Sequence, residues 1–147
     1  MKTSDLLPIV IDTREQKPWV FDPADVFVSR AALPAGDYSI AGLESRVALE
    51  RKSIGDLVQT VIHDWLRFRK ELNRLSGYDV AAVVVEGTLE QIVKHQYESA
   101  ADPAGVLGRV NAIFLDHGIP VLFWGSPQLA VNMAYRLLHL AWRKYHA

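Results

Sequence analysis

Short apolar runs, separated by proline, glycine and charged residues, occupy the first third of the chain. Their lengths and their content of β-branched and aromatic residues are typical of β-strands. The candidate strands are Leu7–Ile11, Val26–Val28, Tyr38–Ile40 and Arg46–Glu50. Pro34–Gly36 supplies a turn between two of them. This pattern predicts a run of short, mostly antiparallel strands.

The pattern changes at Ser53, after which apolar residues recur at helical spacing as far as Gly77. Ser53 is a suitable N-cap for this helix. Further helices are predicted over residues 88–95 and 103–117, with Gly118 as a C-cap, and from Pro127 to about Lys144. Continuous apolar runs at 80–85 and 119–124 predict two buried strands.

Strands first, then helices alternating with strands, predict an α/β domain with a mixed central sheet flanked by helices in three layers. We find no internal repeat and no linker composition, so residues 1–147 are expected to form one domain. Half of the residues are hydrophobic and 22% are charged, which is a globular composition.

Composition also excludes several classes of function. The absence of cysteine excludes thiolate metal sites and cysteine catalysis, and it favours a reducing, cytoplasmic compartment. No apolar stretch approaches the roughly 20 residues that a membrane span requires. The formal net charge of −1 predicts weak, strongly salt-dependent binding if the partner is nucleic acid.

Acidic residues stand at the ends of several candidate strands or in turns: Asp12, Asp37, Glu50 and Glu86. Because side chains alternate along a strand, Glu50 and Lys52 are expected to share one face while Arg51 points to the other. Magnesium prefers oxygen ligands, commonly one or two carboxylates with water and phosphate. Paired carboxylates beside a lysine therefore fit metal-assisted phosphodiester hydrolysis, although composition alone also allows a surface salt bridge.

The order of these residues resembles the XPF-type structure-specific nuclease family. The signature of that family is Gly-Asp, a variable gap, then Glu-Arg-Lys, three residues and Asp. Every fixed position is filled in this chain, by Gly36-Asp37 and by Glu50-Arg51-Lys52 with Asp56. The likeness also includes Asp12-x-Arg14-Glu15 and extends over roughly the first 90 residues.

The resemblance implies a restriction-endonuclease-like fold and a Mg²⁺- or Mn²⁺-dependent DNA endonuclease, acting at branched DNA or at junctions of single strands with duplex. Carried over by position, Asp37 and Glu50 are metal ligands and catalytic residues. Asp12 joins the metal site directly or through water, and Lys52 is catalytic. Cleavage is expected to leave a 5′-phosphate and a 3′-hydroxyl.

The same resemblance implies supporting roles for four further residues. Arg14 and Arg51 are expected to support the site or to bind DNA phosphate. Asp56 is expected to orient Arg51 or Lys52. Many family members have an arginine after the signature aspartate, and Arg67 is an offset substitute for it.

The resemblance leaves the partners of the chain open. XPF-type proteins usually append helix-hairpin-helix DNA-binding modules, which these 147 residues do not contain. Either a homodimer formed through the apolar final helix or a partner protein is expected to supply DNA contacts. The compact chain looks most like bacterial or phage members, with DNA repair among the expected contexts. The alternatives are a non-catalytic DNA-binding adaptor with the nuclease fold, and an enzyme that acts on RNA or on one specific DNA sequence.

Two groups of side chains have competing interpretations. Trp19 and Phe21 either stack on an unpaired base or pack in the core, and core packing is the more common outcome. A basic stripe at helical spacing either follows the DNA backbone or forms a solvated face with an Arg67–Glu71 ion pair. The stripe comprises His63, Arg67, Lys70 and Arg74.

Overall fold

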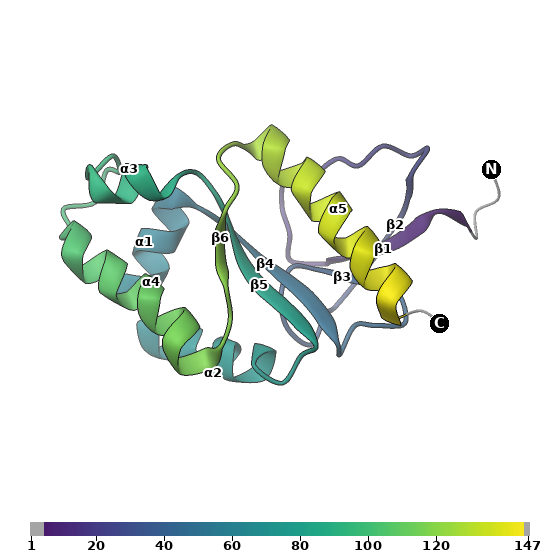
Figure 1. Cartoon of the computed structure of the whole chain (residues 1–147), viewed down its shortest axis with the longest axis horizontal. Coiled ribbons are helices and arrows are strands. Elements are labelled where there is room, and N and C mark those ends of the chain that lie inside the picture. Colours follow the sequence, from purple (N-terminus) through teal and green to yellow (C-terminus); the bar gives the residue numbers. More distant parts are fainter. Residues whose placement is uncertain (1–4, 146–147) are drawn as a thin grey trace.

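Six strands form one mixed sheet between two layers of helices in the computed structural model, which describes residues 5–145 (Figure 1). The strands are β1 (Leu7–Asp12), β2 (Val26–Ala31), β3 (Tyr38–Ile40), β4 (Val47–Ser53), β5 (Val80–Glu86) and β6 (Val121–Phe123). The helices are α1 (Ile54–His63), α2 (Trp65–Leu75), α3 (Leu89–Val93), α4 (Pro103–His117) and α5 (Pro127–Tyr145). The strand order is β2-β1-β3-β4-β5-β6.

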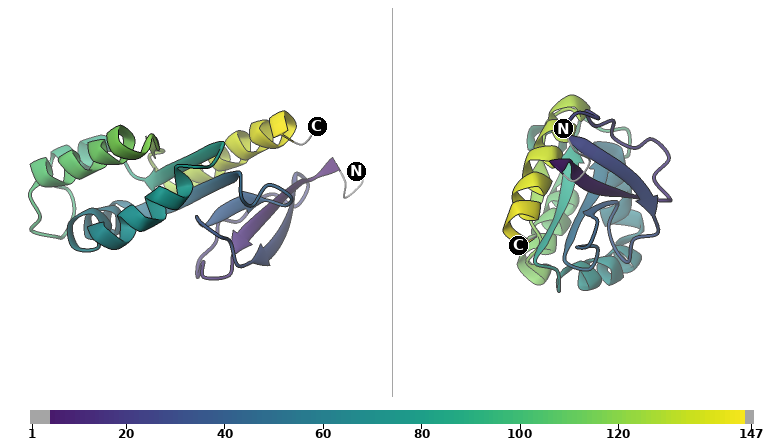
Figure 2. Two further views of the ribbon diagram at one scale, coloured as in Figure 1. Left: turned by 90° about the horizontal axis from the view of Figure 1, so that it is seen from below. Right: turned by 90° about the vertical axis from the view of Figure 1, so that its right-hand side faces the viewer.

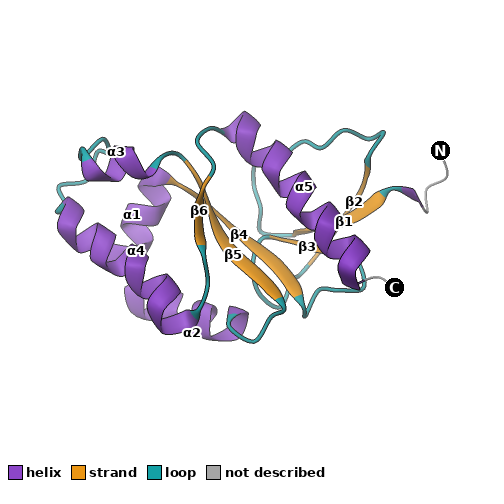
Figure 3. Cartoon of the chain, viewed as in Figure 1, coloured by secondary structure: helices purple, strands orange, loops and turns teal. Residues whose placement is uncertain are grey.

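Each face of the sheet has its own hydrophobic core. Helices α1 to α4 pack on one face, where Ala48, Val83 and Val85 point. Helix α5 alone covers the other face, where Leu49 and Val84 point. Figures 1 and 3 show α5 on its own beside the sheet, and Figure 2 shows α1, α3 and α4 at the end of the molecule far from β1 and β2. The predicted three-layer α/β architecture is confirmed.

The expected antiparallel arrangement of the first strands is only partly correct. Strand β3 pairs antiparallel with both β1 and β4, but β2 runs parallel to β1 along the full length of both strands. The segment from 13 to 25 explains the difference, because Trp19 and Phe21 in it are core residues on the α5 face. Because these rings are buried on that face, residues 13–25 run back along the sheet to the end at which β1 begins. Strand β2 therefore starts beside the start of β1 and runs parallel to it.

Two other elements also differ from the prediction. The single helix expected from Ser53 to Gly77 is broken at Asp64, whose φ of −116° and ψ of 24° are not helical. The break lets α2 pack through its own buried stripe of Phe68, Leu72 and Leu75. The strand expected over 119–124 is shorter, and its residues Val121–Phe123 are only half-buried because β6 lies at the sheet edge.

The later helices follow their predicted caps closely. Helix α4 begins at Pro103 and ends before Gly118, whose φ of 68° is the left-handed conformation of a glycine C-cap. The Ser126 hydroxyl accepts a hydrogen bond from the Leu129 amide at the start of α5, as expected for an N-cap. Within residues 5–145, each helix is too short or too polar to cross a membrane.

Gly36 fixes the turn that leads into β3. Its φ is +79°, and a Cβ added there would lie 2.9 Å from the Ala48 Cβ and 3.2 Å from the Leu49 carbonyl oxygen. Both positive φ and close approach to β4 therefore require glycine. The turn matters for function because Asp37 follows directly.

Gly36→Ala should lower the free energy of unfolding by about 2 kcal/mol, because it adds both backbone strain and a steric clash. Gly108→Ala is the matched control, since a Cβ added at that position in α4 meets no atom within 4 Å. The control should be neutral or stabilising by up to about 1 kcal/mol. Urea unfolding measures both, and equal effects would contradict this account of the turn.

Candidate active site

Strand pairing brings three of the predicted acids together. Asp12 ends β1, Asp37 immediately precedes β3, and Glu50 lies in β4. The Asp12 amide donates a hydrogen bond to the Asp37 carbonyl at 2.9 Å, and the Asp37 amide donates to the Leu49 carbonyl at 2.8 Å. The backbone of Asp37 is therefore fixed between the end of β1 and the middle of β4.

Glu50 and Lys52 share one face of β4, as strand alternation predicts. Their Oε2 and Nζ atoms are 3.4 Å apart, and Nζ lies 5.3 Å from the centre of the Phe68 ring on α2. Glu50 is only 5% exposed, and no donor among residues 5–145 reaches its buried Oε1. Burial raises the pKa of Glu50 well above its ordinary value, and the nearby charges of Asp37 and Glu71 raise it further.

Asp37 is the second acid of this group. Its Oδ2 accepts a hydrogen bond of 2.7 Å from the Arg51 amide. Burial raises the pKa of Asp37 to about 6 in spite of that bond, and the negative charges of Glu15 and Glu71 act in the same direction. An acid poised in this way is easily ionised when a cation approaches.

Glu71, on α2, is a member of the group that the sequence patterns missed. After burial, the charge of Glu71 is among the causes that raise the pKa values of Asp37 and Glu50. The predicted Arg67–Glu71 surface pair is wrong, because the ion pair of Arg67 is with Asp64 at 3.3 Å. The available signal was the position of Glu71 three residues after Phe68, which places it beside the buried stripe of α2.

Asp12 lies nearby but has partners of its own. Its carboxylate accepts hydrogen bonds from the Arg14 Nε at 2.8 Å and from the Leu33 amide at 2.9 Å. Burial opposes ionisation, but the bonds from Arg14 and Leu33 outweigh it and lower the pKa of Asp12. Asp12 therefore orients Arg14, whose side chain is 76% exposed and carries a charge into solvent beside the acids.

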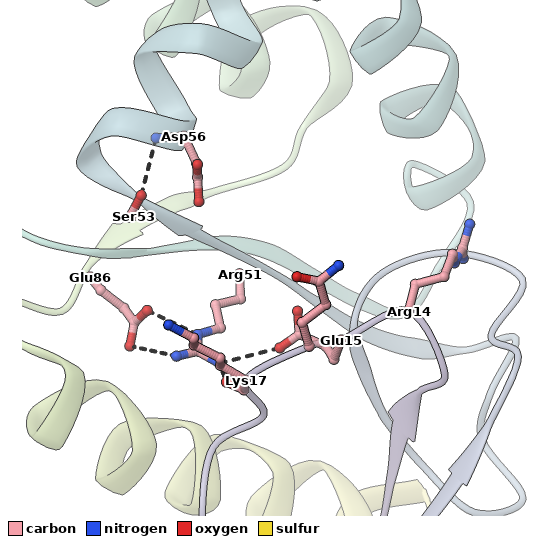
Figure 4. Close-up of a pocket in the computed structure, with 8 residues that line it drawn as sticks. Arg14, Glu15, Lys17, Arg51, Ser53, Asp56 and Glu86 are labelled. Carbon is pink, nitrogen blue, oxygen red and sulfur yellow. Dashed lines mark hydrogen bonds and ion pairs between the residues drawn. The ribbon is translucent and has the colours of Figure 1, made fainter.

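Arg51 points to the opposite face of β4, where it joins the strand to the segment between β1 and β2. Its guanidinium pairs with Glu86 at 2.9 Å and with Glu15 at 3.2 Å, and it donates to the Lys17 carbonyl at 2.7 Å (Figure 4). The guanidinium also lies 4.9 Å from the Trp19 ring centre, and the indole of Trp19 donates to Glu86. Arg51 is thus a structural clamp between β4, β5 and this segment.

The expected pairing of Asp56 with Arg51 or Lys52 is wrong for the described residues 5–145. Arg51 is bonded to the partners given above, and Lys52 is paired with Glu50. The Asp56 amide instead donates to the Ser53 hydroxyl at 3.1 Å, which caps α1. The Asp56 carboxylate is exposed in the first turn of that helix, where the helix dipole favours it.

An open pocket of about 370 Å³ lies over the clamp, lined by Arg14, Lys17 and Arg51 together with five other residues (Figure 4). Asp37, Glu50 and Lys52 do not line it. The pocket therefore adjoins the acidic group and does not contain it. Its three cationic lining residues are balanced by three acidic ones, Glu15, Asp56 and Glu86, and two of these already pair with Arg51.

The aromatic residues have a core role. Trp19 is 5% exposed and Phe21 is 8% exposed, and Trp19 stacks on Tyr38 with ring centres 4.4 Å apart. Core packing is therefore confirmed over base stacking. The side chains of the predicted basic stripe are all exposed on α1 and α2, so a path for the DNA backbone and a solvated face, without the Arg67–Glu71 pair, both stay open.

No group of three or more acidic or histidine side chains within residues 5–145 forms a ready-made metal cage. Magnesium does not require one, because it usually keeps several waters and binds one or two carboxylates with substrate phosphate. The buried Glu50 Oε1 has no donor in the described part of the chain, and the charge of Asp37 acts on the Glu50 carboxyl. These hard oxygen atoms in an acidic setting fit a divalent cation.

A mixed sheet between helical layers, with carboxylates gathered where β1, β3 and β4 adjoin, is an α/β fold of the restriction-endonuclease-like class. A model of the ERCC4 domain matches residues 11–137. The chain therefore belongs to the ERCC4 domain family, and the predicted resemblance is confirmed.

Solved structures show the same fold. XPF from Aeropyrum pernix matches with a TM-score of 0.68 and 22% identity, over 91% of this chain and 61% of that chain. XPF from the same organism in complex with DNA matches with a TM-score of 0.68 and 21% identity, over 94% and 66%. This chain thus spans less than two thirds of each of these two Aeropyrum pernix chains. No curated protein matches it.

Breaking the Arg51 clamp should strongly destabilise the protein. Arg51→Met leaves Glu86 largely buried and unpaired, and we expect a loss of about 2–4 kcal/mol in the free energy of unfolding. A double-mutant cycle with Glu86→Gln should give a coupling energy above about 1 kcal/mol. The matched control is the exposed Glu90–Lys94 pair, expected to couple by about 0.3–0.5 kcal/mol. Equal coupling in both pairs would refute the clamp.

The raised pKa of Asp37 predicts a pH-dependent stability in protein stripped of metal with EDTA. A carboxyl group with a folded-state pKa of about 6 and an ordinary value of 3.8 stabilises the fold most at low pH. That contribution is lost as the pH rises through about 6. Relative to Asp37→Asn, the wild type should therefore lose up to about 3 kcal/mol between pH 4 and pH 7. Parallel pH profiles in urea unfolding would show that this assignment is wrong.

Proposed function

We propose that this chain is a metal-dependent DNA endonuclease, cutting phosphodiester bonds at branched DNA or at single-strand–duplex junctions. The observation that carries the proposal is the buried Oε1 of Glu50, which has no donor among residues 5–145 and lies in one group with Asp37 and Lys52. The DNA complex of the Aeropyrum pernix XPF supports nucleic acid as the substrate class. Membership of the ERCC4 domain family supports the reaction type.

In this proposal Asp37 and Glu50 hold Mg²⁺ or Mn²⁺ at the scissile phosphate, with Asp12 assisting through Arg14. The bound ion would supply Lewis-acid chemistry, making water a stronger acid and withdrawing charge from the phosphoryl oxygens. The Lys52 ammonium stabilises negative charge that develops on those oxygens in the transition state. Exposed Arg14 contacts a neighbouring phosphate, and Arg67 with the rest of the basic stripe follows the DNA backbone.

Lys52→Met should reduce cleavage at least 10²-fold, because it removes a preorganised charge from the transition state. Lys94→Met, which removes an exposed lysine from the end of α3, should cleave at the wild-type rate. Both are assayed with Mg²⁺ or Mn²⁺ on flaps, forks, single strands and duplexes. DNA binding should stay close to wild type in both variants, and thermal stability should do so when it is measured with Mg²⁺ or Mn²⁺, because the bound ion would then offset the charge of Glu50.

The outcomes separate the competing functions. A wild-type protein that binds branched DNA but leaves every substrate uncut would be the non-catalytic adaptor. Cleavage confined to RNA, or to one DNA sequence, would show that the protein is a nuclease whose substrate is not branched or junction DNA. A parallel loss of cleavage and thermal stability in Lys52→Met would show that the Lys52–Glu50 ion pair stabilises the fold and that Lys52 has no catalytic role.

We also propose that two copies of the chain associate through α5, which would double the surface available to DNA. The helix buries Ala134 and Leu138 against the sheet while Leu129 and Leu140 are 50% and 62% exposed. Leu140→Glu should lower the sedimentation coefficient from that of a dimer to that of a monomer. A monomeric wild type at micromolar concentration would exclude this arrangement and favour a partner protein as the source of further DNA contacts.

An intracellular role in bacterial or phage DNA repair remains a prediction.

A further inference from the structure

A second open pocket, of about 520 Å³, lies at the break between α1 and α2. The chain leaves its helical path at Asp64, and α4 packs against both helices. Trp65, Leu66 and Arg67 line the pocket from the first turn of α2, and Arg109 reaches it from α4. Three helices therefore build the pocket, whereas the predicted basic stripe lies on α1 and α2 alone.

Arg109 is held in place by contacts with the two other helices. Its Nη1 donates a hydrogen bond of 3.1 Å to the Val61 carbonyl in the last turn of α1, and its guanidinium carbon lies 4.9 Å from the Trp65 ring centre. Within residues 5–145, Arg109 makes no ion pair with a carboxylate. A guanidinium has five N–H donors in a fixed fork, so most of them remain for a ligand. The contacts thus order a cationic group whose charge is not neutralised.

The charges that line the pocket are positive on balance. Two arginines, Arg67 and Arg109, stand against one acid, Asp64, which pairs with Arg67 at 3.3 Å. That pair is weak, because the Arg67 side chain is 82% exposed and the Asp64 side chain is 36% exposed. In a chain with a formal net charge of −1, such a local excess of guanidinium groups suits a phosphate.

Apolar side chains lie beside these arginines. Leu66 is 75% exposed and Trp65 is half-buried, and both line the same pocket. A duplex keeps its bases stacked inside, so it would present only phosphates and sugars here and leave the leucine in water. An unpaired nucleotide presents a phosphate together with the apolar face of its base. The combination of guanidinium and apolar side chains therefore favours a single strand.

The pocket lies close to the proposed catalytic group. Trp65 and Phe68 are three residues apart on α2, so their side chains are neighbours on one side of the helix. Lys52 Nζ lies 5.3 Å from the Phe68 ring centre. A nucleotide held beside Trp65 is therefore near Lys52, in the direction along which α2 runs.

We propose that the pocket at the α1–α2 break binds one unpaired nucleotide of the DNA substrate, with its phosphate on Arg109 and Arg67 and its base against Leu66 and Trp65. This inference rests on the DNA-cleaving function proposed above, and it names the part of the substrate that the chain recognises. It adds a residue of α4 to the DNA contacts of the basic stripe. It also gives the protein a preference for DNA with an unpaired strand beside the cut.

The test measures DNA binding by fluorescence anisotropy in EDTA, so that no strand is cut. Three labelled probes of equal length are compared: oligothymidine, an abasic chain with the same phosphates, and a duplex. Leu66→Ser removes an apolar contact, and its matched control is Leu115→Ser, at a leucine of α4 that is 81% exposed and outside the pocket. Arg109→Met removes a charge, and its matched control is Arg143→Met, at an exposed arginine near the end of α5.

Leu66→Ser should raise the Kd for oligothymidine about threefold or more, and it should leave the Kd for the abasic chain unchanged. Arg109→Met should raise the Kd for both single-stranded probes about tenfold. Its slope of log K against log salt should become shallower by about 0.7. The duplex should bind each variant as tightly as it binds the matched control.

Several results would overturn the pocket. Leu66→Ser could bind oligothymidine as tightly as Leu115→Ser does, or it could weaken the abasic chain equally. Arg109→Met could weaken duplex and single-strand binding by the same factor. Any of these results, together with cleavage of branched DNA by the wild type in Mg²⁺ or Mn²⁺, would leave the proposed function intact.

Two further outcomes also decide the matter. If loss of the bond to the Val61 carbonyl unfolds Arg109→Met, the comparison of Leu66→Ser with its control decides alone, because the Leu66 side chain is 75% exposed. A wild type that binds none of the three probes would overturn both the pocket and the proposed function.

Discussion

The burial of the Glu50 carboxylate is the constraint on which the site depends. Strand β4 lies between β3 and β5, with a hydrophobic core on each face, so a charge placed in its second half is cut off from water. Lys52, 3.4 Å away, supplies one positive charge against the carboxylates of Glu50, Asp37 and Glu71. The metal-free protein responds by raising the pKa values of Glu50 and Asp37. A divalent cation would offset the same repulsion without a proton.

The alternation of side chains along β4 divides two tasks between the faces of the sheet. Glu50 and Lys52 face α2 and carry the proposed chemistry. Arg51 faces the other way and ties β4 to Glu86 of β5 and to Glu15 in the segment after β1. The Arg51 amide also holds the Asp37 carboxylate. A three-residue stretch thereby supplies reactive groups and the scaffold that fixes them.

The local sequence pattern predicted the features that depend only on residues close together in the sequence, such as strand faces and helix ends. The period of two placed Glu50 with Lys52, and the caps at Gly118 and Ser126 located two helix ends. The partners of Arg51 were not predictable in this way, because Glu15 and Glu86 are each about 35 residues distant and are brought together by tertiary packing. Glu71 was missed because a glutamate four residues after Arg67 resembles a solvated helix pair. The continuous apolar spacing also conceals the break at Asp64, which sets the direction of α2.

The most direct test of the account is anomalous diffraction at the manganese edge from crystals grown with Mn²⁺. The account predicts a strong peak beside Glu50 Oε1, within ligand distance of the Asp37 carboxylate. The absence of a peak at that position, or a peak only at exposed carboxylates elsewhere on the surface, would contradict a metal centre at Glu50 and Asp37.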